Sequence, residues 1–197
     1  INFLIKKDCK IVIISHIGRP KGKVNKELSL KPICESLERK INQKIKLINE
    51  NIFKIKKDEL FKNFDGQIIF LENIRFYEEE EKNDTKFSKH LASLADLYVN
   101  DAFSCSHRSH SSIDGVAHLM PSAAGRLMQR ELEALDRALD QPARPVAAIV
   151  GGNKISTKLG VLENLLDKVD HLIVGGAMAN TFLFANGVTV GSSICEM

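Results

Sequence analysis

Apolar residues along the chain fall into two patterns, short continuous runs and stripes with helical spacing. Residues 11–14 and 68–71 are continuous apolar runs rich in isoleucine, a pattern typical of strands buried on both faces of a parallel sheet. Weaker runs predict further strands at residues 46–48, 97–99, 146–150 and 172–174.

Between these runs, apolar residues recur every three or four positions, which predicts amphipathic helices. Strands that alternate with helices predict an α/β fold, with a mainly parallel sheet flanked by helices in a Rossmann-like arrangement. The four glutamates at 78–81 are expected to form a solvated loop. The helical stripes are Leu30, Ile33, Leu37 and Ile41; Phe87, Leu91 and Leu94; Met128, Leu132, Leu135 and Leu139; and Leu162, Leu165, Leu166 and Val169.

The helix expected at 126–140 is followed by Pro142 and Pro145, which end it and make it the natural connector between two domains. Composition also changes along the chain: residues 1–100 contain 17 Lys and 2 Ala, whereas residues 101–197 contain 3 Lys and 12 Ala. A domain boundary contributes to such a change, and a join between two related genes near Ser111 is an alternative hypothesis.

The 197 residues suffice for one ordinary domain, or for one domain and part of another. No apolar run approaches the roughly 20 residues of a membrane helix, and the first ten residues lack a signal-peptide core. Four cysteines without metal-ligand spacing are expected to be free thiols in a cytoplasmic protein. Residues 1–62 hold 16 Lys and Arg against 7 Asp and Glu, a local charge of +9. This field favours anions, either nucleic acid or small phosphorylated molecules.

Basic side chains follow three of the predicted strands, where ligands of open α/β sheets bind. Arg19 follows the first strand, Arg75 follows the strand at 68–71, and Arg108 lies in the loop after 97–99. We expect the three arginines to converge on one anion, because guanidinium groups bind phosphate or carboxylate through paired hydrogen bonds. His107 and His110 raise a metal site as an alternative, but no Cys or carboxylate has the matching spacing, and no metal ligand is predicted.

A second candidate site follows the strand at 146–150. Gly151 and Gly152 form a turn, and Lys154 and Lys158 are expected on one face of the next helix, near its N-terminus. Backbone N–H groups at a helix start bind phosphate. The patterns GxxxxGK[ST] and GxGxxG are both absent, and two ordinary surface lysines are the alternative explanation.

Six stretches of the chain resemble the phosphoglycerate kinase family, in family order and with family-like spacing. They are SHIGRP at 15–20, LENIRF at 71–76, YVNDAF at 98–103, HRSH at 107–110, GGNKISTK at 151–158 and GGAMANTF at 175–182. The resemblance covers essentially the whole chain. It implies reversible phosphoryl transfer, in glycolysis and gluconeogenesis, between 1,3-bisphosphoglycerate and ADP to give 3-phosphoglycerate and ATP. It also implies Mg²⁺ bound with the nucleotide, and a monomer at full length.

The resemblance further implies a two-domain kinase fold, of which this chain holds most of the N-terminal domain and the start of the C-terminal one. Residues 1–125 would form the phosphoglycerate-binding domain without its first strand and helix, 126–142 the interdomain helix, and 143–197 the start of the nucleotide-binding domain.

Residue roles follow from the same resemblance. The phosphoglycerate ligands would be His16, Ile17, Gly18, Arg19, Arg75 and Arg108. The nucleotide ligands would be Gly152, Asn153, Lys154, Lys158, Gly175 and Gly176. Arg19, Lys154 and Lys158 would act in catalysis, with Lys158 following the transferred group. These roles agree with the chemistry, since phosphoryl transfer depends chiefly on positioning and charge neutralisation.

Departures from the family pattern limit this prediction. Asn153 stands where the family usually has Ala or Ser, and Ala177 replaces a common Gly. The family's first strand with its Asp and Asn ligands, its upstream catalytic Arg, its Mg-binding Asp and its ribose-binding Glu are missing. The chain is therefore expected to be a partial sequence that is inactive alone. Two alternatives are another phosphate-binding α/β protein and a basic nucleic-acid-binding module, although aromatics total only 6%.

Overall fold

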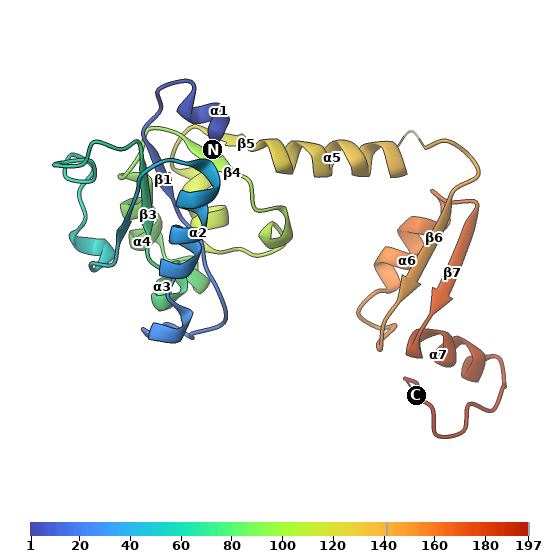
Figure 1. The fold of residues 1–197 in the computed structure, drawn as a ribbon. Helices are drawn as coiled ribbons and strands as arrows, with labels where there is room; N and C mark the ends of the chain where they lie inside the picture. The colour runs from blue at the N-terminus through green and yellow to red at the C-terminus, as the bar shows by residue number, and fades with distance from the viewer. Residues whose placement is uncertain (141, 197) are drawn as a thin grey trace. The chain divides into compact units, whose positions relative to one another are not determined.

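The computed structural model describes residues 1–140 and 142–196, which form two compact units, Ile1–Met128 and Gln129–Met197 (Figure 1). Gln141, inside the expected connector 126–142, and Met197 lie outside the described residues, as does the side chain of Leu139. Every strand pair in both units is parallel and is accompanied by helices, which confirms the α/β class. No helix in the described part of the chain is long and apolar enough to cross a membrane.

A three-stranded parallel sheet forms the centre of the first unit. Its middle strand is β3 (Ile68–Leu71), which pairs with β1 (Ile11–Ile13) on one side and with β2 (Ile45–Ile48) on the other. A separate parallel pair joins β4 (Tyr98–Asn100) to β5 (Ser122–Ala124). Since the strands of the central sheet run in the same direction, the loops that leave β1 and β3 emerge at the same edge.

The two faces of β3 belong to two hydrophobic clusters, because successive strand residues point to opposite faces. On one face, Ile68 and Phe70 pack with Leu30 and Cys34, at the start of α2 (Lys31–Ile41). On the other face, Ile69 and Leu71 pack with residues of α4 (Thr85–Ala92), among them Phe87 and Leu91. All four residues of β3 are buried as a result.

The remaining helical segments of this unit are α1 (Asn2–Ile5), α3 (Glu78–Glu81), the 3-10 turns η1 (Lys26–Leu28), η2 (Ile52–Lys54), η3 (Ile74–Phe76), η4 (Phe103–Cys105) and η6 (Val116–His118), and the π turn η5 (Ser111–Gly115).

The prediction of a solvated loop at 78–81 is wrong. These residues form the helical turn α3, and Glu80 is only 2% exposed. Glu80 is buried because its carboxylate accepts hydrogen bonds from the backbone N–H (2.9 Å) and the hydroxyl (2.5 Å) of Ser112. Only pairing of this kind makes the burial of a carboxylate tolerable.

The second unit contains one parallel pair, β6 (Ala147–Gly151) with β7 (His171–Gly175), and the helices α6 (Leu159–Leu166) and α7 (Ala177–Ala185). α5 (Arg126–Leu139) begins in the first unit and continues into the second. One face of the strand pair is open, with Ile149 77% and Ile173 51% exposed.

The helix that follows β6 begins later than expected. Lys158 is the residue that precedes α6, and Lys154 lies in the loop before it. The prediction that Lys154 and Lys158 share a helix face is therefore wrong. A turn over Ile155–Lys158, with a backbone hydrogen bond of 2.7 Å between these residues, delays the start of the helix.

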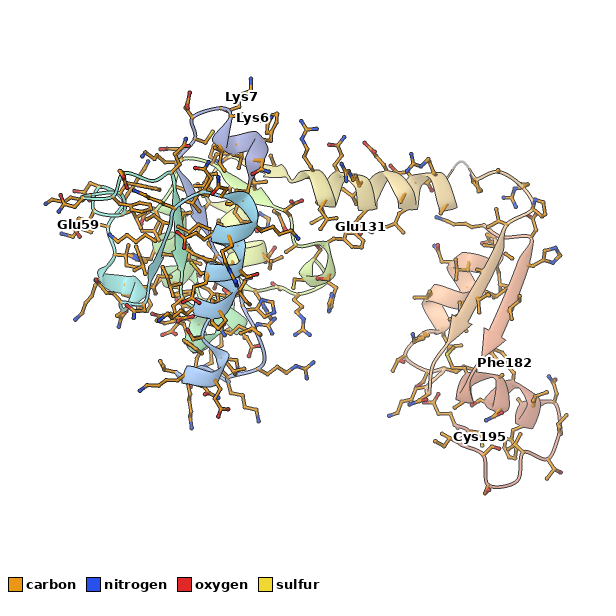
Figure 2. The ribbon with its side chains drawn as sticks, viewed as in Figure 1. Lys6, Lys7, Glu59, Glu131, Phe182 and Cys195 are labelled. Atoms are coloured by element: carbon orange, nitrogen blue, oxygen red, sulfur yellow. The ribbon has the colours of Figure 1, made fainter. Side chains whose placement is uncertain are left out.

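The positive charge of residues 1–62 is spread over the surface of the first unit. Lys6, Lys7 and Glu59 project outward from it (Figure 2). Several lysines are paired with carboxylates, including Lys44 with Asp65 at 2.6 Å. Such pairing neutralises part of the positive charge of this unit.

Candidate anion-binding site

Arg75 occupies the centre of the candidate site in the first unit. It lies in η3, directly beyond β3, and is 5% exposed. Its Nη1 donates a hydrogen bond of 3.3 Å to the carbonyl of Gly18, and its Nε lies 3.7 Å from a carboxylate oxygen of Glu81. Among the described residues, nothing accepts a hydrogen bond from this buried Nε. A buried guanidinium with an unused donor is suited to an anionic ligand.

Three further basic side chains lie near Arg75, and we call His16, Arg75, Arg108 and His110 the basic cluster. Burial is the main cause that lowers the pKa of His16, and the charges of Arg75, His110 and Arg108 lower it further. Burial and Arg75 likewise lower the pKa of His110, while Glu81 opposes the shift. The positive charges of the arginines therefore act on both histidines, and a bound anion would neutralise the positive charge of the basic cluster.

Sequence reasoning placed three residues of the basic cluster in one site and did not assign His110 to it. Arg19 lies in the loop after β1, where its side chain is exposed. The structure shows no hydrogen bond or ion pair from Arg19 within residues 1–140 and 142–196. Ile17 and Gly18, in the same loop, are exposed as well. The structure thus brings His16, Arg75 and Arg108 together, and leaves the side chain of Arg19 exposed.

Glu80 lies behind the basic cluster and was missed by sequence reasoning. Its Oε1 atom is 3.8 Å from Nδ1 of His110, and both side chains are almost completely buried. Burial raises the pKa of Glu80, against the effect of its hydrogen bonds with Ser112 and of the charge of Arg75. Because Ser112 donates two hydrogen bonds to Glu80, Glu80 holds the segment that contains His110 and Ser112 against α3.

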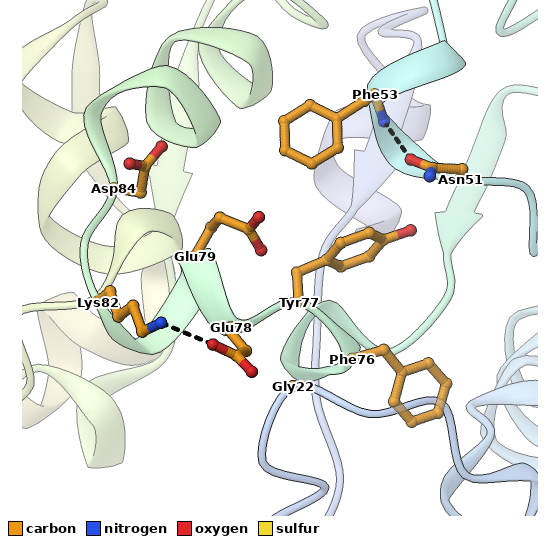
Figure 3. Close-up of a pocket in the computed structure, with 9 residues that line it drawn as sticks. All are labelled: Gly22, Asn51, Phe53, Phe76, Tyr77, Glu78, Glu79, Lys82 and Asp84. Atoms are coloured by element: carbon orange, nitrogen blue, oxygen red, sulfur yellow. Dashed lines mark hydrogen bonds and ion pairs between the residues drawn. The ribbon is translucent and has the colours of Figure 1, made fainter.

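A cavity of about 510 Å³ lies beside this region, and it has a different character (Figure 3). Its charged side chains are mainly acidic, and Lys82 points to Glu78, with which it forms an ion pair of 2.6 Å. A cavity with this charge does not suit an anion. The lining residues are Gly22, Asn51, Phe53, Phe76, Tyr77, Glu78, Glu79, Lys82 and Asp84, none of which was assigned to a site from the sequence.

Glycines gather at the carboxyl ends of β6 and β7 in the second unit. Gly151 pairs with Gly175 across the two strands, and the N–H of Met178 donates to the carbonyl of Gly152 at 3.0 Å. Gly176 has a φ of 65°, and a Cβ atom there would lie 3.2 Å from the Gly152 carbonyl oxygen. The close approach of the two turns therefore requires glycine at this position.

Lys158 lies against this glycine turn. A Cβ atom on Gly152 would lie 3.3 Å from Cε and 3.7 Å from Nζ of Lys158. Lys154 and Asn153 are exposed in the loop between the strand and the helix. The structure thus places one of the two lysines at the glycine turn and the other in solvent.

The loop that carries these lysines already holds a carboxylate. Glu196 accepts hydrogen bonds from the backbone N–H groups of Ile155 (2.7 Å) and Ser156 (2.9 Å) and from the Ser156 hydroxyl (2.5 Å). These bonds, chiefly those with Ser156, lower the pKa of Glu196. Sequence reasoning missed this contact, since the partners are about 40 positions apart and no pattern links them.

No group of three or more His, Cys, Asp or Glu side chains in the described part of the chain is placed to hold a metal ion. His107, considered with His110 as a possible ligand pair, is exposed. His110 instead faces Glu80 and the arginines.

Comparison with known proteins agrees with the geometry. The sequence model of the family described as "Phosphoglycerate kinase" matches residues 1–197. A phosphoglycerate kinase of Zymomonas mobilis is 52% identical over 200 residues, which is 100% of this chain and 49% of the relative. One of Bartonella bacilliformis is 50% identical over 98% of this chain and 48% of the relative.

Solved structures show the same likeness. The structure of phosphoglycerate kinase from Coxiella burnetii is similar with a TM-score of 0.84 and 45% identity, over 99% of this chain and 49% of that one. A phosphoglycerate kinase of Pyrococcus horikoshii has a TM-score of 0.78 and 33% identity, over 96% and 49% of the respective chains. The chain spans about half the length of the relatives it matches.

Proposed function

Because this chain belongs to the phosphoglycerate kinase family, we propose that its basic cluster binds the phosphorylated carboxylate substrate, 3-phosphoglycerate or 1,3-bisphosphoglycerate. The observation that supports this most directly is the convergence of His16, Arg75 and Arg108, with a buried Arg75 Nε that has no hydrogen-bond acceptor within the described residues. Guanidinium groups in a partly buried site bind phosphate strongly, because little solvent competes for their donors.

We propose that the whole protein transfers a phosphoryl group reversibly between 1,3-bisphosphoglycerate and ADP. The acyl phosphate leaves as a stable carboxylate, so the reaction needs no general base. The arginines of the basic cluster would orient the substrate, and Lys158 at the glycine turn would neutralise charge that develops on the transferred group. Mg²⁺ would enter the site bound with the nucleotide and would neutralise charge on its phosphates.

The two units correspond, in this proposal, to two functional parts. The phosphoglycerate part would be residues 1–125 and the start of the nucleotide part residues 143–197, joined by 126–142. The phosphoglycerate ligands would be His16, Ile17, Gly18, Arg19, Arg75 and Arg108. Those for the nucleotide would be Gly152, Asn153, Lys154, Lys158, Gly175 and Gly176.

Calorimetric titration of the 197-residue chain tests the binding half of this proposal. We expect 3-phosphoglycerate to bind saturably and to be displaced by sulfate, whereas glycerate, which lacks the phosphate, binds much more weakly. A single-stranded oligonucleotide in a parallel titration distinguishes the nucleic-acid alternative. Absence of phosphoglycerate binding, or tighter binding of the oligonucleotide, would contradict the proposal.

Anion binding at the basic cluster is expected to strengthen as the pH falls. The pKa values of His16 and His110 lie below the ordinary 6.5 in the free protein, and a bound anion favours their protonated forms and raises both values. The affinity for the anion should therefore rise as the pH falls through the range between the histidine pKa values of the bound protein and those of the free protein. Below the pKa values of the free protein, the affinity should level off. Sulfate is a suitable probe because it does not itself titrate in this range. Equal sulfate affinity at pH 8 and pH 6 would show that the histidines do not contact the anion.

A further inference from the structure

We propose that Asn73 is a positioning residue for the anion site, whose side-chain amide holds both ends of the loop at residues 17–28 and so sets where His16 and Arg19 lie relative to Arg75. We call residues 17–28 the basic loop, since Arg19, Lys21, Lys23 and Lys26 outnumber its single acid, Glu27. The inference rests on the proposed function in one respect, that the ligand of this loop is a phosphorylated carboxylate.

Asn73 is completely buried directly beyond β3. Its Nδ2 donates to the carbonyl of Ile17 at 2.9 Å and to the carbonyl of Leu28 at 2.9 Å. An amide nitrogen carries two hydrogens, so both are used, one at each end of the basic loop. One side chain thus closes the loop at its base.

The same side chain also fixes the backbone of Arg75. Asn73 is the N-cap residue of η3, and its Oδ1 accepts a hydrogen bond of 3.1 Å from the N–H of Arg75 inside that turn. The amide therefore joins two structural parts of the anion site: the loop that carries Arg19 and the turn that carries the buried guanidinium. A shift of Asn73 would change the distance between them.

Few other contacts hold the basic loop in place. The N–H of Gly22 donates to the Arg75 carbonyl at 3.3 Å, and Arg75 Nη1 donates to Gly18 at the same distance. Val24 near the tip is 79% exposed. Glu72 anchors the chain only after the loop, where it accepts hydrogen bonds from Ser29 and Leu30. Without Asn73, both loop ends lose their shortest contacts, and two partly buried carbonyl groups lose a hydrogen-bond donor, which is unfavourable.

Asn51 provides a matched control for Asn73. Both asparagines precede a 3-10 turn, and both accept a hydrogen bond from the backbone N–H two residues ahead, at 3.0 Å for Asn51 and 3.1 Å for Asn73. Asn51 is exposed, however, and the structure shows no hydrogen bond from its amide nitrogen within the described residues. Aspartate keeps the shared acceptor at either position, so only Asn73→Asp removes contacts to the loop.

The experiment compares Asn73→Asp and Asn73→Ser with Asn51→Asp and Asn51→Ser in the 197-residue chain. Serine tests the effect of the charge that aspartate introduces, since it keeps a cap acceptor without burying a carboxylate. We expect both Asn73 variants to bind 3-phosphoglycerate about tenfold or more weakly, as the loss of a buried polar contact predicts. The Asn51 variants should bind within about twofold of the original chain. Equal affinities for all four variants would overturn the inference.

Two measurements without ligand separate positioning from a general loss of stability. Trypsin should cleave after Lys21, Lys23 and Lys26 faster in the Asn73 variants, whereas the rate of cleavage after Lys40, in α2, should not change. The NMR titration of His16 should move towards the ordinary histidine value, because the ring moves away from Arg75. If cleavage and titration remain as in the original chain, Asn73 does not position the loop.

The same measurements keep this inference separate from the proposed function. If the original chain fails to bind 3-phosphoglycerate but the Asn73 variants still free the loop, the proposed function fails and the positioning role holds. If Asn73→Asp does not fold, the decision rests on Asn73→Ser, read by the same cleavage and titration.

Discussion

Replacing Arg75 with methionine is expected to weaken the binding of 3-phosphoglycerate about 100-fold, or about 3 kcal/mol. Methionine fills much of the volume of the arginine stem, so the packing of η3 should survive. The loss comes from the guanidinium, which has a buried, unused Nε donor and, of the nearby charges, the largest effect on the pKa values of His16 and His110. Calorimetric titration of the 197-residue chain measures the change directly.

Arg39→Met is the matched control for this variant. Arg39 is exposed on α2, and its Nε donates only to the carbonyl of Glu35 one turn earlier. Removing it lowers the net charge of the chain by the same amount as Arg75→Met. We expect a change in affinity of less than about twofold at 0.15 M salt, where charges more than about 8 Å away are screened. If the two variants weaken binding equally, the effect is due to net charge and the basic cluster is not the site.

The strands of this protein could be predicted well because their signal is local. The apolar runs at 11–14 and 68–71 correspond to β1 and β3, and even the weak run at 46–48 corresponds to β2. Burial on both faces of β3 requires apolar residues at every position, so this strand is recognisable without knowledge of its partners. The short β5 lacks such a signal, since Ser122–Ala124 is exposed throughout.

The error at residues 78–81 has a physical cause. Four consecutive glutamates suggest solvent, because an isolated carboxylate is costly to bury. The cost of burying the Glu80 carboxylate is reduced only by its hydrogen bonds with Ser112, which lies 32 positions further along the chain. No local pattern contains that information, so the burial of Glu80 could be known only from the fold.

The candidate site shows the same division between local and distant information. The rule that ligands bind beyond the ends of parallel strands predicted one site for Arg19, Arg75 and Arg108, and in the structure the charges of Arg75 and Arg108 act on His16. The rule places a residue in a loop but does not orient its side chain, and for that reason it could not show that Arg19 lies in solvent. Asn73 was noticed only as part of a motif, since its contacts with Ile17 and Leu28 span 56 and 45 positions.

Replacing Phe87 with alanine is expected to lower the free energy of unfolding of the first unit by about 3–5 kcal/mol, the largest effect on stability that we predict. Phe87 is completely buried, and its ring centroid lies 5.4 Å from those of Phe53 and Tyr77. The smaller residue removes the apolar contact between α4 and the sheet and leaves a cavity that the surrounding residues fill only in part.

Tyrosine fluorescence during urea unfolding measures this change, because the chain has no tryptophan and both of its tyrosines, Tyr77 and Tyr98, belong to the first unit. Phe3→Ala is the control, since Phe3 is 51% exposed and its main described contact is the guanidinium of Arg126 over its ring. Exposed contacts of this kind contribute about 0.5–1 kcal/mol. The two truncations remove the same atoms, so the difference between them isolates burial. Equal losses would mean that α4 does not pack on β3 in solution, and that the turn which carries Arg75 lacks the support on which the anion site depends.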